Sequence, residues 1–116
     1  MSREQQVSKA YRSVPTVREE IKMKFNNWSM TRIRAGEKVL TSRKKRYEDD
    51  EDVIEIVGEL PWWFIREYLH KPEGAENPQQ LQSIINQIFR RVVEDDERFF
   101  VHVIDTYNVI DRSNPK

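Results

Sequence analysis

The chain has 116 residues, with 20 Lys and Arg against 20 Asp and Glu, so its formal net charge is zero. This length suits one domain with a modest core. The absence of Cys excludes disulfides, thiolate metal sites and Cys nucleophiles, and no run is long and apolar enough to span a bilayer. We therefore expect a soluble intracellular protein, cytoplasmic or nuclear, that does not bind membranes.

The neutral total hides a sorting of charge along the chain. Residues 1–47 contain 13 basic and 4 acidic side chains, a net charge of +9, whereas residues 48–116 contain 7 basic and 16 acidic side chains, a net charge of −9. A protein polarised in this way presents two surfaces with different electrostatic preferences. This asymmetry is the main clue to function in the sequence.

Residues 1–14 are polar and basic, without a sustained apolar period. They predict a flexible basic arm. The clustered apolar side chains all follow, and we expect residues 15–112 to form a single domain.

The first predicted helix covers about residues 17 to 34. Thr16 and Glu19 have the spacing of a capping box, and Gly36 is suited to end the helix. Spacings of four, four and three place on one stripe the apolar side chains of Val17, Ile21, Phe25 and Trp28.

The middle of the chain predicts two further helices. Apolar residues at 53–60 have helical spacing, and the acidic run before them favours a helix N-terminus through the helix dipole. Pro61 is suited to open the next helix, over 62–69, which carries the densest apolar patch of the chain.

The last part of the chain has the strongest helical pattern. Asn77 and Pro78 provide a cap followed by a first-turn proline. An apolar stripe runs from Leu81 to Val93, and the same phase returns from Phe99 to Ile110. One long bent helix or two helices in line would fit this pattern.

The pattern favours an all-α domain of four to five helices over an α+β fold. The alternative has short strands near 53–57 and 99–110, because both segments are rich in β-forming residues. Two strands alone are marginal, and a third, from residues 38–47, has only Val39 and Leu40 to bury. We therefore expect the helical fold.

Basic side chains with interleaved aromatic residues predict nucleic-acid contact in the first half of the chain. Cationic side chains release counterions when they neutralise phosphates, and aromatic rings can stack on unpaired bases. The candidates for binding DNA or RNA are Lys22, Lys24, Arg32, Arg34, Lys38, Arg43, Lys44, Lys45 and Arg46.

A second set of candidates predicts a protein partner or self-association. Trp62 and Trp63 are adjacent, so on a helix they point about 100° apart and one of them can remain exposed as an anchor. Asp95, Asp96 and Glu97 form an acidic cluster suited to a basic surface on another protein.

These features predict a small non-enzymatic nucleic-acid-binding or regulatory protein, in which the basic half contacts phosphates and the acidic half forms the core and a partner surface. The alternative is a protein-interaction adaptor or inhibitor whose acidic face engages a basic target. We predict no catalytic residues, metal site or cofactor. A metal-dependent nuclease built from scattered carboxylates is the one enzymatic alternative.

Overall fold

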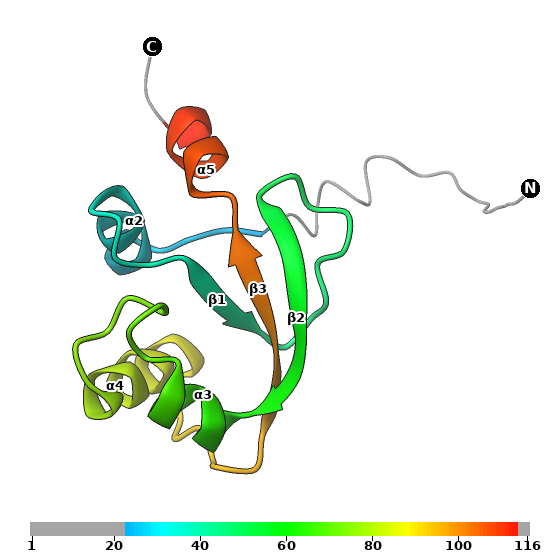
Figure 1. Cartoon of the computed structure of the whole chain (residues 1–116). Helices are drawn as coiled ribbons and strands as arrows, with labels where there is room; N and C mark the ends of the chain where they lie inside the picture. The colour runs from blue at the N-terminus through cyan, green and yellow to red at the C-terminus, as the bar shows by residue number, and fades with distance from the viewer. Residues whose placement is uncertain (1–22, 114–116) are drawn as a thin grey trace, which may run out of the picture.

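The computed structural model describes residues 23–113, which form an α+β fold (Figure 1). One antiparallel sheet has the strand order β1-β3-β2. Its strands are β1 (Leu40–Arg43), β2 (Val53–Pro61) and β3 (Arg98–Ile104), and the helices described are α2 (Asn27–Arg34), α3 (Trp62–Tyr68), α4 (Pro78–Phe89) and α5 (Thr106–Ser113). The predicted all-α fold is therefore wrong, and the α+β alternative matches the structure.

β2 replaces the helix expected at 53–60. Its apolar residues satisfy the helical period as well as an extended one, but β-branched side chains prefer the extended backbone. Gly58 has a φ of +153°, a conformation that L side chains rarely adopt, at one of two register shifts opposite β3. Pairing with β3 therefore determines the extended conformation of residues 53–61, whose apolar spacing alone also fits a helix.

β3 replaces the first part of the predicted C-terminal helix. It is the central strand, and its side chains at Phe99, Val101, His102 and Ile104 are buried. The helical pattern is kept only in α5, which begins at Thr106.

β1 is the third strand that the sequence reasoning rejected for lack of apolar residues. Its two central side chains, Thr41 and Ser42, are buried although they are polar. Their neighbours Lys38, Glu73 and His102 are also buried. Buried polar groups are tolerated when they hydrogen-bond to one another, so apolar counting missed this strand.

The helix ends agree with the sequence better than the strands do. α4 begins at the Asn77 cap and Pro78, as predicted, and α2 ends before Gly36, whose φ is +77°. The predicted continuous helix over 17–34 is wrong at residues 23–26, which are not helical: the Asn26 side chain caps α2, and the helix begins at Asn27. The expected start of that helix near residue 17, and the predicted arm at 1–14, lie outside the described residues.

The core is divided between the two ends of the sheet (Figure 1). α3 and α4 cover one end with eight buried residues, among them Trp62, Ile85 and Phe99. At the other end α2 and α5 pack around three buried residues, Ile33, Ile104 and Val109. β3 supplies residues to both clusters and joins them. None of the helices within residues 23–113 has the length and apolar character needed to cross a membrane.

Candidate protein-interaction surface

The structure distributes the predicted nucleic-acid contacts over different environments. Lys22 lies outside the described residues. Lys38 is buried, Arg32 and Arg43 are half-buried, and the exposed members are Lys24, Arg34, Lys44, Lys45 and Arg46. Four of the nine, at positions 24, 38, 43 and 44, line one cavity between β1, α2 and α4.

Lys38 is a structural cation. Its Nζ donates to the carbonyl oxygens of Leu40 and Glu73, at 2.8 and 3.0 Å, and lies 3.1 Å from Glu73 Oε1. Burial lowers the pKa of Lys38, and the facing carboxylate partly offsets that effect. The Ser42 hydroxyl donates to the other oxygen of the same carboxylate. Because its three ammonium donors are satisfied internally, Lys38 is not available to a phosphate.

Other basic candidates also have partners within the chain. Lys44 Nζ lies 3.1 Å from Glu97 Oε1 and 4.4 Å from the centre of the Phe99 ring. Arg43 Nη2 donates to the Lys24 carbonyl oxygen at 2.6 Å, and burial lowers the pKa of Arg43. Three further arginines donate to Glu37 at 3.0 Å (Arg32), to Ser113 at 3.0 Å (Arg34) and to Glu48 at 2.6 Å (Arg46). These contacts compete with phosphate binding.

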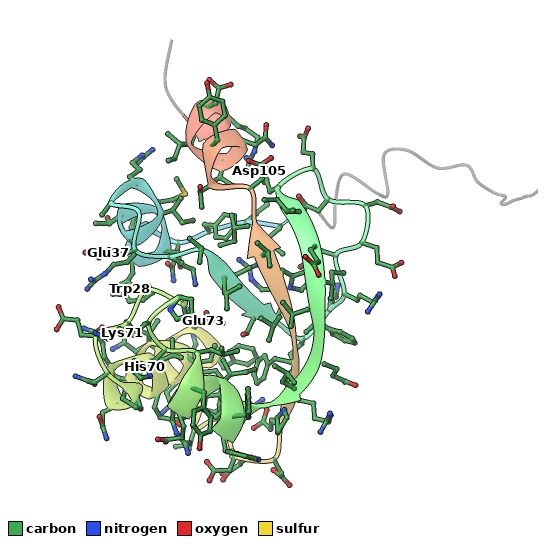
Figure 2. All side chains as sticks on the ribbon, viewed as in Figure 1. Trp28, Glu37, His70, Lys71, Glu73 and Asp105 are labelled. Carbon is green, nitrogen blue, oxygen red and sulfur yellow. The ribbon has the colours of Figure 1, made fainter. Side chains whose placement is uncertain are left out.

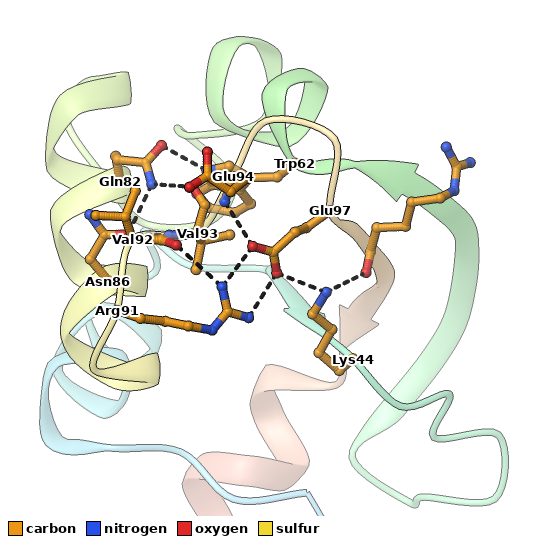
Figure 3. Close-up of polar contacts among 10 residues, drawn as sticks. Lys44, Trp62, Gln82, Asn86, Arg91, Val92, Val93, Glu94 and Glu97 are labelled. Atoms are coloured by element: carbon orange, nitrogen blue, oxygen red, sulfur yellow. Dashed lines mark hydrogen bonds and ion pairs between the residues drawn. The ribbon is translucent and has the colours of Figure 1, made fainter.

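Glu97 connects the acidic loop before β3 to the basic segment after β1 (Figure 3). Its carboxylate accepts two hydrogen bonds from the Arg91 guanidinium, at 2.7 and 2.8 Å, and one from the Glu94 amide at 2.8 Å. The hydrogen bonds from Arg91 hold the pKa of Glu97 well below its usual range. Glu97 therefore orders the loop, and its oxygens are already occupied by partners in its own chain.

The remaining acidic candidates are more accessible. Asp95 is exposed and forms an ion pair with Arg66, at 2.6 Å between Oδ1 and Nη1. Asp96 is exposed beside it. The predicted acidic cluster is thus split into one structural residue and two surface residues.

The two adjacent tryptophans, both predicted as partner-binding residues, lie in different environments. Trp62 is buried, and its Nε1 donates to Gln82 Oε1 at 2.8 Å. Trp63 is 43% exposed and forms an aromatic cluster with Phe64 and Tyr68, whose ring centres lie 5.7 and 6.5 Å away. Trp62 is a core residue, so only Trp63 remains a candidate anchor.

The sequence reasoning missed a more distinctive surface on β2, the outer strand on the side of β3 opposite β1 (Figure 1). Its two register shifts skip Ile54 and Val57, which have no partner residue in β3. These two side chains are 66% and 54% exposed. A β-bulge re-aims a side chain, and here each bulge turns an apolar residue into solvent.

Acidic side chains border these apolar residues. Glu55 and Glu59 are exposed on the same strand. In the acidic run before it, Asp52 is buried and paired with Arg112. At the far end the Trp63 amide donates to the Asp95 carbonyl oxygen at 3.0 Å, which places the second acidic loop beside the end of β2. We call Ile54, Glu55, Val57 and Glu59 the β2 surface.

One basic side chain contacts this strand within the described residues. Arg98 approaches it, with its Nη2 donating to the Glu59 carbonyl oxygen at 3.1 Å and its Nε 3.8 Å from Glu59 Oε1. Arg98 therefore covers the Glu59 end of the β2 surface, and the accessible part extends from Ile54 to Val57. The only signal of the β2 surface in the sequence was a run of β-branched residues interrupted by glutamates and a glycine.

Comparisons add no functional information, because no family model, curated protein or solved structure matches the chain. Within residues 23–113 no three His, Cys, Asp or Glu side chains gather in a way that would hold a metal ion. The geometry of the described surface is therefore the basis for assigning a function.

Proposed function

We propose that the protein is a protein-interaction module whose β2 surface binds an extended basic segment of another protein. The observation that carries this proposal is the pair of bulges that expose Ile54 and Val57 on an outer strand bordered by acidic side chains. Outer strands with exposed apolar side chains are sites where another chain adds to a sheet.

The two kinds of side chain would contribute differently. Apolar anchors supply most of the affinity of an interface. The exposed Glu55 selects a basic partner and speeds its encounter, an effect that weakens as salt rises. The preferred partner is therefore a strand-forming segment in which basic and apolar residues alternate.

The proposal is tested with fluorescein-labelled nine-residue peptides of alternating Lys and Val, and of alternating Glu and Val, measured by fluorescence anisotropy. We expect the basic peptide to bind and the acidic peptide to fail. Replacing both anchors, as I54S with V57S, should weaken binding by about tenfold or more, since each buried apolar anchor is worth about 1 kcal/mol or more.

V92S is the matched control. Val92 is an apolar side chain, 62% exposed, in the segment after α4, and α4 covers the end of the sheet opposite Ile54, so its loss should leave peptide binding unchanged (Figure 1). Equal binding of both peptides, or an I54S/V57S variant that binds as well as the parent, would overturn the proposal.

Labelled single-stranded DNA and RNA serve as further probes in the same assay. Nucleic-acid binding that survives I54S/V57S and falls steeply between about 50 and 200 mM salt would instead support the nucleic-acid function predicted for the basic residues.

A further inference from the structure

A cavity of about 220 Å³ lies between β1, α2 and α4. Figure 2 shows Trp28 and Glu73, two of its lining residues, in the space between α2 and the pair formed by α3 and α4. The volume exceeds the roughly 150 Å³ of an apolar cavity that admits benzene. It therefore has room for a molecule of one ring or a short alkyl chain.

The two walls of this cavity differ in chemistry. One wall comes from α3 and α4 and is apolar, with Trp62, Leu81, Ile84, Ile85, Ile88 and Phe89. The other wall comes from β1 and the start of α2, and it includes Asn26, Ser29, Thr41 and Ser42. A ligand that fills the cavity must therefore be amphipathic.

The polar wall carries a surplus of positive charge. Lys24, Lys38, Arg43 and Lys44 line it against one anion, Glu73. Glu73 is paired with Lys38, as described above, and Lys44 is paired through Glu97. Within residues 23–113, Lys24 and Arg43 form no ion pair. Arg43 donates to neutral groups, the Thr41 hydroxyl and the Lys24 carbonyl oxygen, and no carboxylate of the described chain is paired with either cation.

The start of α2 reinforces this preference. Asn26, its cap, and Ser29, in its first turn, both line the cavity. The helix dipole places partial positive charge at this end. Two cationic side chains and a helix N-terminus thus face the same space.

We propose that the cavity binds a small amphipathic carboxylate, with its ring or alkyl chain against α4 and its carboxylate toward Lys24 and Arg43. A cation of the same shape is repelled by the polar wall. A neutral analogue fills the apolar wall but gains no ionic contact. Inorganic phosphate leaves the apolar wall uncovered. This site is separate from the β2 surface, and its test does not depend on the proposed function.

The test uses three ligands that share one ring: benzoate, benzyl alcohol and benzylamine. Each is titrated into the full chain labelled with ¹⁵N, and amide shifts are followed by NMR. We expect benzoate to shift the amides of Ser42 and Ile85, with an affinity on the order of millimolar for so small a ligand. Benzyl alcohol should bind about fivefold more weakly or worse, and benzylamine should not bind.

Two pairs of matched variants locate the site. K24E should weaken benzoate binding by about fivefold or more, whereas K45E changes an exposed lysine that does not line the cavity and should have no effect. I88W should block the cavity, whereas V92W replaces another exposed apolar residue outside it. All four positions are exposed, and thermal unfolding checks that each variant folds.

The outcomes are decisive in both directions. Benzoate shifts confined to the lining residues and lost in K24E and I88W support the carboxylate site. Equal binding of the three ligands would overturn the charge preference, and the absence of shifts at about 20 mM benzoate would overturn the site.

Discussion

At the level of single residues, the buried pair of Lys38 and Glu73 has the largest predicted effect on stability. Removing one charge leaves the other buried without a partner, so K38M should lower the free energy of unfolding by about 3–5 kcal/mol. Urea denaturation followed by circular dichroism measures the change.

The exposed pair of Arg46 and Glu48 provides the control. Both side chains are about half exposed or more, so R46M should change the free energy of unfolding by less than about 1 kcal/mol. The double variant K38M/E73L should lose less stability than its two single variants together, because no uncompensated charge remains. A K38M protein as stable as the parent would contradict a structural role for this pair.

His102 predicts a pH dependence of stability. Its Nε2 accepts a hydrogen bond from the Tyr47 amide at 3.1 Å, and its Nδ1 donates to the Thr41 carbonyl oxygen at 3.3 Å, so the neutral ring is the form that fits. Burial lowers the pKa of His102, and the nearby Arg43 charge adds to this. The unfolded chain takes up a proton near pH 6.5 and the folded chain does not, so the free energy of unfolding should fall as the pH drops below about 6.5.

Urea denaturation from about pH 7.5 to about pH 5 measures this slope, which approaches about 1.4 kcal/mol per pH unit for one proton. H102Q removes the titrating group and should flatten the curve in that range. The same slope in H102Q would assign the effect to a different group.

At the level of elements, the end of α4 contains an avoidable strain. Arg90 is the one residue other than glycine with a positive φ in the described part of the chain, at +59°. Glycine adopts this conformation without a Cβ clash, so R90G should raise the free energy of unfolding by about 0.5–1 kcal/mol.

A35G is the matched control for R90G. Ala35 caps α2 with a φ of −80°, a conformation in which glycine relieves no strain. Because glycine also makes the unfolded chain more flexible, A35G should lower the free energy of unfolding by about 0.5–1 kcal/mol. Thermal and urea unfolding of both variants measures the difference. Destabilisation of equal size in the two variants would show that the backbone at residue 90 is unstrained.

The start of α4 and the end of α2 were predictable because their signals are local, whereas the sheet was not. The Asn77 cap acts on amides within its own first turn, and the turn at Gly36 depends on its own φ. The strands depend on partners distant in sequence. The apolar residues at 53–60 fit the helical period as well as the extended one. The buried side chains of β1, Thr41 and Ser42, are polar, and a search for apolar patterns treats polar residues as exposed.

The candidate surfaces also depend on contacts between residues that are distant in sequence, which the sequence pattern does not predict. The exposure of Ile54 and Val57 depends on a register shift against β3, and no local pattern encodes that shift. Lys44 and Glu97 were assigned to opposite functions, yet the fold pairs them. The geometry of adjacent helical residues allowed one of the two neighbouring tryptophans to be exposed, but only the packing of α3 decides that it is Trp63.

At the level of the whole molecule, the divided core predicts two units of unequal stability. Among residues 23–113, the cluster beneath α3 and α4 has eight buried residues, and the cluster between α2 and α5 has three. Amides of α2 and α5 should therefore exchange with solvent through openings of lower free energy than those of α4 and β3. Hydrogen exchange followed by mass spectrometry measures both.

V109A tests this division directly, because Val109 is buried in the smaller cluster. It should accelerate exchange in α5 and α2 and leave α4 unchanged. I85A, in the larger cluster, should accelerate exchange throughout. Uniform acceleration in V109A would show that the two clusters open together.

The three tryptophans differ in exposure, so intrinsic tryptophan fluorescence can report on different parts of the molecule. Trp28 lines the cavity beneath the Arg32 guanidinium, 5.1 Å from the ring centre, Trp62 is buried and lines the same cavity from α3, and Trp63 is exposed on α3. Variants that keep one indole and replace the other two with Phe would therefore report ligand entry, through Trp28 or Trp62, or contact at α3, through Trp63. Each event can then be followed without an attached dye.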